Sequence, residues 1–322
     1  MMRTTAPVAI FVYNRADHTA RTIKHLQRNL LATETDVYFF SDGGRDETSW
    51  RAVNKVRKLL HKVTGFRSVS IIERPCNYYL EQNVIEGINQ VLKTHDRIIV
   101  MEDDIVSSPY YLTYMNDALD YYRNDKQVMH VAGFTNLDIP EKGDTYFSPH
   151  VTSSGAWATW RDRWEKFVHY GSREEALAGL TNTDIARITY DGRFDCLKML
   201  DRHPVPWDIC WNIAVYRHGG LALHPTHTLV RNIGLSSGAH FTGLQNSRLF
   251  GWYEFDRPYS NHHVKIGGIP VAEDAEIERM YGYALTDHGM RYNILGKVAR
   301  KFYKYLKESD EKDEKEEKKV EK

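Results

Sequence analysis

Residues 97–104 read RIIVMEDD, an apolar run that ends directly in Glu102, Asp103 and Asp104. The run predicts a buried strand. Three adjacent carboxylates at its end are costly, because like charges repel and a buried carboxylate needs a partner. A hard divalent cation, Mn²⁺ or Mg²⁺, removes this conflict because it prefers oxygen ligands. The segment therefore predicts a metal site at a strand end, with a solvated acidic turn as the alternative.

The direction of the three side chains follows from the same strand. Because side chains alternate along a strand, Asp103 is expected to face one side while Glu102 and Asp104 face the other. One carboxylate is then expected to face a nucleotide and another to face the metal.

The hundred residues before the triplet alternate between β-rich runs and helical patterns. Strands are expected near 7–13, 36–40 and 68–72, before the one at 97–101. The helix after the first strand is expected to be capped by Asp17, with its apolar face formed by Ala20, Ile23, Leu26 and Leu30. Strands joined by crossover helices predict an α/β fold with a mostly parallel sheet flanked by helices, which binds ligands beyond the carboxyl ends of its strands.

Beyond residue 106 the pattern loosens, and Trp, Gly and His become common. We expect residues 1–105 to form a nucleotide-binding half and residues 106–290 an irregular acceptor-side lobe of the same domain. Residues 291–306 predict a basic amphipathic helix that either packs on the body or touches an anionic membrane. Residues 307–322 are almost all Lys, Glu or Asp and predict a disordered tail.

Composition narrows the class of protein. With 43 basic and 43 acidic residues the net charge is zero, so no overall field attracts nucleic acid. The cysteines Cys76, Cys196 and Cys210 are widely spaced, which predicts free thiols rather than a zinc or redox pair. No apolar stretch reaches the roughly 20 residues of a membrane span, and the start shows no signal peptide. A cytoplasmic protein is expected.

Four segments together resemble the motifs of a known protein family. They are AIFVYNR (9–15), FSDGG (40–44), VMEDD (100–104) and PWD (206–208). Their order resembles that of GT-A glycosyltransferases over about residues 6–245, above all the inverting branch that includes N-acetylglucosaminyltransferase I and its bacterial relatives. The resemblance implies that Asp104 ligates Mn²⁺ (or Mg²⁺), that Asp103 contacts the ribose and that Glu102 lies near the transferred sugar.

The resemblance also implies a nucleotide site after the first two strands, built from Asn14, Arg15, Asp42 and Asn83. Arg15 suits a base or phosphate because its guanidinium is a fixed fork of donors; the alternative is an ion pair with Asp17. Asp42 is a candidate acceptor for the N–H of a uracil ring, or a turn residue before two glycines.

An inverting transfer needs a carboxylate that removes the acceptor proton. Asp208 is the candidate, because it follows PVPW (204–207) at the start of a predicted helix. The alternative is a helix N-cap. The family shows a second Asp where this chain has Ile209.

Two features are candidates for the acceptor side and the metal. The run GAWATWRDRW (155–164) places Trp157 and Trp160 where a sugar can stack, or else on the apolar face of a helix. His240 ends the Gly/Ser-rich run NIGLSSGAH (232–240) and is either a metal ligand or an ordinary loop residue.

The sequence thus predicts an inverting, metal-dependent glycosyltransferase for polysaccharide biosynthesis. Its donor is a nucleotide sugar, with UDP-sugars favoured, and its acceptor is a glycan or lipid-linked glycan, reached from the inner membrane surface. One alternative is a sugar-1-phosphate nucleotidyltransferase, although the loop Tyr13-Asn-Arg-Ala-Asp lacks the expected glycines. Another is a non-catalytic carbohydrate-binding protein. A dinucleotide oxidoreductase is disfavoured, since no G-x-G-x-x-G follows a strand.

Overall fold

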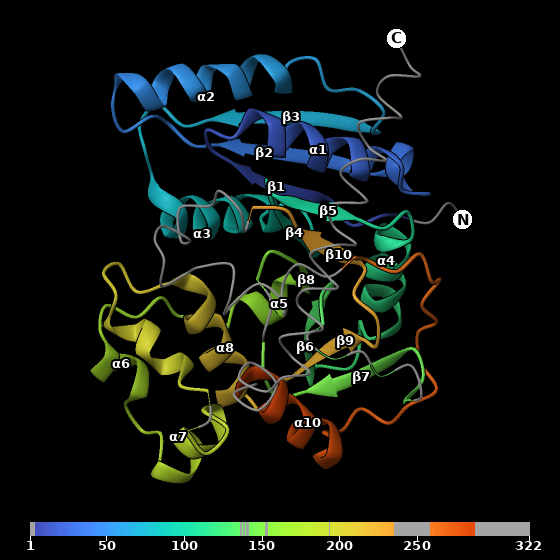
Figure 1. The fold of residues 1–322 in the computed structure, drawn as a ribbon, viewed down its shortest axis with the longest axis vertical. Coiled ribbons are helices and arrows are strands. Elements are labelled where there is room, and N and C mark those ends of the chain that lie inside the picture. Colours follow the sequence, from blue (N-terminus) through green and yellow to red (C-terminus); the bar gives the residue numbers. More distant parts are fainter. Residues whose placement is uncertain are drawn as a thin grey trace, which may run out of the picture.

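The structure, a computed structural model, describes residues 4–135, 137, 139, 142–151, 154–192, 194–234 and 258–286 (Figure 1). The predicted helix at 291–306, the tail at 307–322 and His240 lie outside these residues. Within the described ranges, none of the helices has both the length and the apolarity that crossing a bilayer requires.

The first four strands are parallel, as predicted. They are β1 (Val8–Val12), β2 (Asp36–Ser41), β3 (Ser68–Glu73) and β4 (Arg97–Glu102), and they lie in the order β3-β2-β1-β4. The helices α1 (Ala16–Gln27), α2 (Glu47–Leu60) and α3 (Tyr79–Leu92) connect them.

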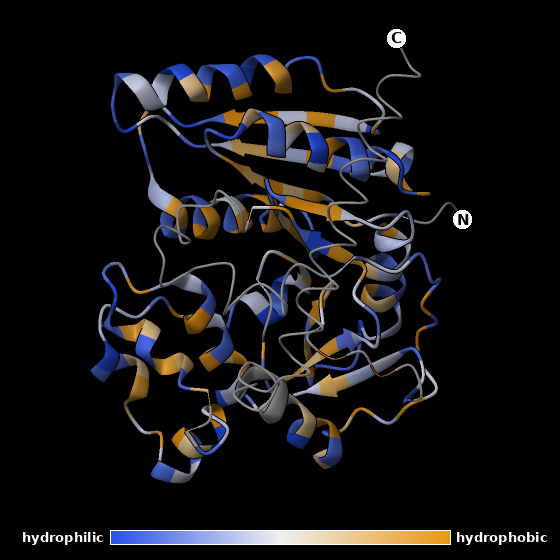
Figure 2. Ribbon diagram, viewed as in Figure 1, coloured by the Kyte–Doolittle hydropathy of each residue, from blue (hydrophilic) through white to orange (hydrophobic). Residues whose placement is uncertain are grey.

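Alternation along β1 explains why both faces of the sheet are covered. Val8 and Ile10 belong to the core cluster that includes residues of α1 and α2, whereas Ala9 and Phe11 belong to the cluster that includes residues of α3. All residues of β1 are buried, and the strand carries mainly hydrophobic colours in Figure 2. A strand apolar on both sides is therefore sandwiched between helices.

Helix α1 differs from the expectation at both ends. Arg15 occupies the N-cap position, and Asp17 lies in the first turn of the helix. The helix ends at Gln27, so Leu30 falls outside its apolar face and is 62% exposed.

The sheet continues into the second half of the chain. Strand β8 (Ala156–Trp160) lies antiparallel between β4 and β6 (Val128–Ala132), followed by β9 (Leu221–Pro225) and β7 (Thr145–Ser148). One eight-stranded, mixed sheet therefore runs through both halves. A separate ribbon pairs β5 (Ile105–Ser107) with β10 (Val230–Asn232).

Further helices cover this second half, with α6, α7 and α8 grouped beside the strands (Figure 1). They are α4 (Tyr111–Tyr121), α5 (Arg161–Trp164), α6 (Arg173–Leu177), α7 (Asn182–Ile188), α8 (Trp207–Arg217) and α10 (Ala275–Thr286), with the 3₁₀ turns η1 (Ala32–Glu34) and η3 (Cys196–Asp201).

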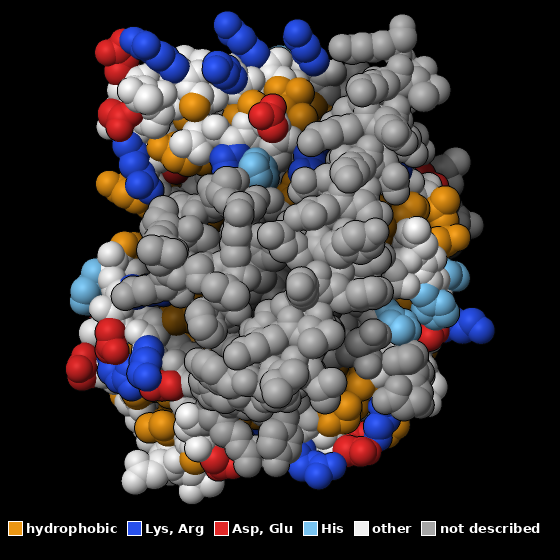
Figure 3. Space-filling view, viewed as in Figure 1, with side chains coloured by type: hydrophobic (Ala, Val, Ile, Leu, Met, Phe, Trp, Pro, Cys, Tyr) orange, Lys and Arg blue, Asp and Glu red, His pale blue; other side chains and the backbone are white. Residues whose placement is uncertain are grey.

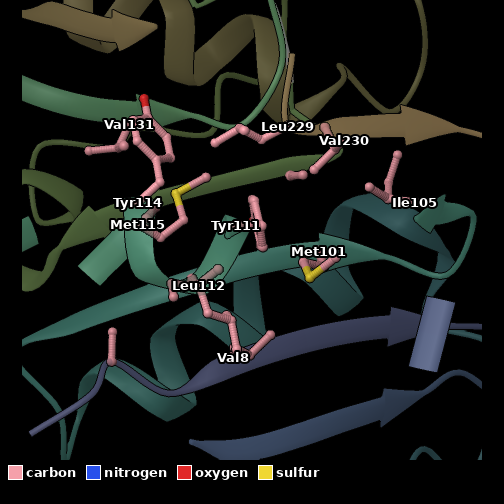
Figure 4. Close-up of a cluster of buried hydrophobic side chains, with 14 of the residues drawn as sticks. Val8, Met101, Ile105, Tyr111, Leu112, Tyr114, Met115, Val131, Leu229 and Val230 are labelled. Atoms are coloured by element: carbon pink, nitrogen blue, oxygen red, sulfur yellow. The ribbon is translucent and has the colours of Figure 1, made fainter. Parts of the chain in front are cut away.

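The core that supports the acidic triplet is drawn in Figure 4. Tyr111 and Leu112 of α4 lie there with Met101, which stands one residue before the triplet, and with Val230 of β10. All four are buried, so the triplet follows a strand that is packed on a rigid base. On the surface, basic and acidic side chains are interspersed over the described part of the face in Figure 3, in keeping with the zero net charge.

Candidate active site

The acidic triplet stands at the carboxyl end of β4 and is shielded from water. Glu102 is the last residue of the strand, and Asp103 and Asp104 form the turn into β5. Asp103 is 3% exposed and Asp104 is 6% exposed. The alternative of a solvated acidic turn is therefore wrong.

Arg15 joins the two aspartates. Its Nη2 hydrogen-bonds Oδ1 of Asp103, and its Nη1 lies 2.9 Å from Oδ2 of Asp104. Both carboxylates thus face one guanidinium, and the expected alternation of Asp103 against Asp104 is wrong because the strand ends at Glu102. In the described ion pairs Arg15 binds Asp103 and Asp104, and not Asp17, which was its expected alternative partner.

The two aspartates keep unsatisfied oxygens. Oδ2 of Asp103 and Oδ1 of Asp104 are buried and have no hydrogen-bond partner. Burial raises the pKa of Asp103 to about 6, although the charge of Arg15 opposes the rise. Buried carboxylate oxygens without donors fit a divalent cation, which takes oxygen ligands. Within the described ranges, however, three or more His, Cys, Asp or Glu side chains do not converge on one point. In the described part of the chain, the oxygens that suit a metal here are those of Asp103 and Asp104.

The end of β10 packs tightly on the triplet. The backbone N–H of Ile233 donates to the carbonyl of Asp104 at 2.8 Å. A Cβ placed on Gly234 would lie 1.9 Å from Oδ2 of Asp104, so this position has no room for a side chain. Sequence reasoning missed this glycine, because only the pairing of β5 with β10 brings it here.

Sequence reasoning also missed His18. It lies one helical turn after Arg15 on α1, where burial and then the charge of Arg15 lower its pKa, while the charge of Asp104 opposes that change. The spacing of three residues from Arg15 was the available signal.

On the nucleotide side, Asp42 is 5% exposed and ties two loops together. Its Oδ1 accepts from the backbone N–H groups of Gly43 at 2.8 Å and Tyr78 at 2.7 Å, and its Oδ2 accepts from Asn77 at 3.0 Å. Burial raises its pKa. These hydrogen bonds are typical of a turn residue, which was the alternative interpretation of Asp42. Its contact with a nucleotide base stays a prediction.

Asn83 is buried on α3 and is engaged within the fold. Its Oδ1 accepts from Nε of Arg74 at 3.0 Å, and its Nδ2 donates to the carbonyl of Phe40 at 3.4 Å. Arg74 in turn lies 4.8 Å from the centroid of the Tyr78 ring, and its Nη2 is buried without a partner. Asn83 thus positions an arginine that sequence reasoning overlooked.

The segment after β1 meets the loop after β2. Asn14 is half-buried between Tyr13 and Arg15. The guanidinium of Arg45 lies 5.8 Å from the Tyr13 ring centroid and 4.7 Å from that of Tyr79. Flat aromatic and cationic groups therefore gather at the carboxyl ends of the parallel strands, where such sheets bind ligands.

Asp208 lines a cavity of about 310 Å³. It is the second residue of α8, whose N-cap is Pro206, so the N-cap alternative is wrong. Its Oδ1 accepts from the N–H of Ile209 at 2.8 Å, and Ser154 donates to its Oδ2 at 3.4 Å. Burial raises its pKa.

Glu102 lines the same cavity as Asp208. Burial, and then the negative charges of Asp104, Asp103 and Asp208, raise the pKa of Glu102 to about 8. A carboxyl with this pKa favours the protonated form at neutral pH, and a protonated carboxyl can donate a hydrogen bond, whereas an ionised carboxylate only accepts.

Trp157 and Trp160 are not part of this cavity. Both lie in β8 and are buried, with 0% and 2% exposed. A spacing of three residues on a strand sends them to opposite faces. Trp157 stacks on Trp207 at 5.6 Å, and Trp160 donates from Nε1 to the carbonyl of Leu119 at 3.1 Å. The expectation that they stack on a sugar is wrong for the described cavity, as is the helix alternative.

Comparison with known proteins shows a similarity over the part of the chain that holds the first half of the site. Residues 8–146 match the family described as Glycosyl transferase family 2, a range that holds the triplet, Arg15, Asp42 and Asn83 but not Asp208. No curated protein matches the chain.

Among solved structures, the mannosyltransferase PcManGT from Pyrobaculum calidifontis, in complex with GDP-Man and Mn²⁺, is similar at 13% identity and a TM-score of 0.39. The similarity covers 68% of this chain and 71% of that chain. Residues 8–146 are thus similar to Glycosyl transferase family 2, and the mostly parallel sheet flanked by helices is consistent with the GT-A fold.

Proposed function

We propose that this chain is an inverting, metal-dependent glycosyltransferase that moves a sugar from a nucleotide diphosphate to a hydroxyl of a glycan acceptor. The observation that supports it most is the joint position of Glu102 and Asp208 on one cavity, beside the buried pair Asp103 and Asp104. The family match over residues 8–146 favours transfer of a sugar over nucleotidyl transfer.

In the proposed reaction Asp208 is the general base. Its carboxylate takes the proton of the acceptor hydroxyl as that oxygen bonds to the anomeric carbon, and the bond from that carbon to the diphosphate breaks. Attack from the face opposite the leaving group inverts the configuration. Ser154 and the N–H of Ile209 orient the carboxylate, and such base assistance contributes roughly 10²–10⁴ in rate.

Asp103 and Asp104 would hold Mn²⁺ (or Mg²⁺) through the oxygens that have no partner within the fold. When bound, the ion supplies positive charge to the departing diphosphate. Arg15 balances the carboxylates on the other side, and its fork of donors also suits a phosphate. Glu102, protonated near neutral pH, is proposed to donate to a hydroxyl of the transferred sugar.

The donor and the place of action are finer proposals. UDP-sugars are favoured over GDP-sugars through the resemblance to the N-acetylglucosaminyltransferase I branch, with Asp42 and Asn14 on the base and ribose side. We also propose that residues 291–306 contact an anionic inner membrane from the cytoplasmic side, which presents a lipid-linked glycan. Co-sedimentation with anionic vesicles that survives deletion of 291–322 would contradict the membrane contact.

A thermal-shift screen of UDP- and GDP-sugars, with and without Mn²⁺, tests the proposed function. A ligand at 100 times its Kd adds about 2.7 kcal/mol of stability, which raises the melting temperature. We expect a rise only when sugar nucleotide and Mn²⁺ are both present, followed by slow release of the nucleoside diphosphate. Release of pyrophosphate from a nucleoside triphosphate would instead indicate a nucleotidyltransferase.

A further inference from the structure

The cavity beyond Asp208 has apolar walls on two sides. Ile188 at the end of α7, Phe194, and Met199 of η3 line one wall. Phe134 and Ile105 line the other, from the side of the sheet and of β5. The helical wall lies outside residues 8–146 and has its own core cluster, which holds Leu197 and Leu200. It is thus a built surface and not a loose loop.

The charges at this cavity are negative or absent. Its described lining contains the carboxyls of Glu102 and Asp208 but neither Lys nor Arg. His150, also on the lining, lies 3.5 Å from Glu278 of α10. Burial lowers the pKa of His150 to about 3 and raises that of Glu278 to about 8. Whichever partner holds the proton, the pair has no net charge.

The cations whose charges reach these groups lie outside the described lining. Arg15, whose charge reaches Glu102, forms ion pairs with Asp103 and Asp104. Arg187, whose charge reaches His150 and Glu278, forms an ion pair with Glu273. Arg202, whose charge reaches Asp208, is exposed. An anion in the cavity would therefore lose its water, gain no described cationic partner and face at least one carboxylate, and each of these costs free energy.

We propose that the acceptor is an uncharged sugar with an apolar face or substituent, and that this cavity rejects acceptors whose sugar carries a carboxylate or phosphate. The apolar part rests between Phe134 and the wall of Ile188, Phe194 and Met199, which leaves the reacting hydroxyl at Asp208. This inference rests on the proposed sugar transfer and names the acceptor class of the same site.

Two probes that differ by one group test it: phenyl β-D-glucoside and phenyl β-D-glucuronide. Binding to the full chain is measured by calorimetry in the presence of Mn²⁺ and UDP. We expect the glucoside to bind at least about tenfold more tightly than the glucuronide, since one like charge in a poorly solvated site is worth more than 1.4 kcal/mol.

A charge swap in the wall provides the second measurement. Met199→Lys adds a cation to the lining, and we expect it to narrow or reverse the preference for the glucoside. The matched control is Lys198→Met, at the residue before Met199, where the side chain is 77% exposed. It should leave the ratio of the two glycoside affinities unchanged.

Equal or tighter binding of the glucuronide by the unaltered chain overturns the inference, and so does binding of neither glycoside. The proposed function fails separately, through absence of Mn²⁺-dependent nucleotide-sugar binding and hydrolysis in the donor screen. Normal donor hydrolysis together with equal binding of the two glycosides would contradict only the inferred acceptor class.

Discussion

Two carboxyls on one cavity are held in different ways. Glu102 is crowded by three other acids, which raise its pKa after burial has done so, whereas Asp208 accepts from a backbone N–H and a hydroxyl that favour its charged form. Burial raises the pKa of both groups, but the hydrogen bonds of Asp208 oppose the rise, whereas the neighbouring acids add to it at Glu102. Such a difference in environment can separate the role of a proton donor from that of a base. Asp208 is therefore the residue we propose as the base.

The first prediction concerns that base. Asp208→Asn keeps the shape of the side chain but cannot take a proton, so turnover should fall by roughly 10²–10⁴. Affinity for the donor nucleotide should stay within about twofold, because Asp208 is proposed to act on the acceptor hydroxyl and not on the nucleotide. Steady-state rates and calorimetry on the same preparation measure both. Near-normal turnover would remove Asp208 from the mechanism.

The second prediction concerns the metal. Asp104→Ala removes a buried oxygen that has no partner, so Mn²⁺-dependent binding of UDP should weaken by at least about tenfold, or roughly 1.4 kcal/mol. Binding is followed by calorimetry at a fixed Mn²⁺ concentration. The control is Asp17→Ala, an exposed acid in the first turn of α1. Unchanged affinity in Asp104→Ala would refute the metal assignment.

The third prediction follows from the raised pKa of Glu102. A carboxyl with a pKa of about 8 in the folded chain and about 4.5 when unfolded binds more protons when folded. Its stabilising effect is complete below pH 4.5 and is lost as the pH rises through 8. The free energy of unfolding without metal should therefore decline from pH 5 to pH 8.5 in urea titrations. Glu102→Gln should flatten this decline, and an equally steep one in that variant would contradict the assignment.

At the scale of elements, local patterns predicted one half of the sheet and missed the other. In β1–β4, strands buried on both faces alternate with amphipathic helices, and this information lies within each segment. In β8, the run with Trp157 and Trp160 becomes a strand because β4 and β6 flank it, which no local spacing reveals. The same limit hid Gly234, Arg74 and Arg45, whose positions depend on contacts between distant loops.

The fourth prediction concerns the ribbon of β5 and β10. Gly234→Ala places a methyl group where Oδ2 of Asp104 lies, so the carboxylate must move away from Arg15. We expect UDP–Mn²⁺ affinity to fall by about tenfold or more, as for loss of Asp104 itself.

The matched control for this variant is Gly220→Ala, which also inserts a methyl at 2.4 Å, but against the flexible Met129 side chain and away from the triplet. Its melting temperature is expected to fall while its nucleotide affinity is kept. If both glycine variants bound UDP–Mn²⁺ normally, the tight packing of β10 on the triplet would have no functional role.

At the scale of the whole molecule, the residue at which the family match ends is not a boundary of the sheet. The match ends at residue 146, yet β6, which lies inside it, is separated from β4 by β8 of residues 156–160. A chain ending at residue 146 would leave open the edges of β4 and β6 that β8 covers, and exposed edges of apolar strands aggregate. Strands from before and after residue 106 therefore share one sheet, and the triplet follows a strand at its centre.

The fifth prediction tests how far the fold depends on this shared sheet. Urea unfolding of the full chain, followed by Trp fluorescence and by far-UV circular dichroism, should give coincident single transitions, because one sheet and its core clusters link both halves. A chain of residues 1–146 should be insoluble or lack the cooperative transition, and it should not bind UDP with Mn²⁺. A soluble, cooperative 1–146 fragment that binds UDP–Mn²⁺ as the full chain does would show that the nucleotide half folds alone. In that case the sheet of the nucleotide half would be stable without β8, and Asp208 would belong to a separate folding unit.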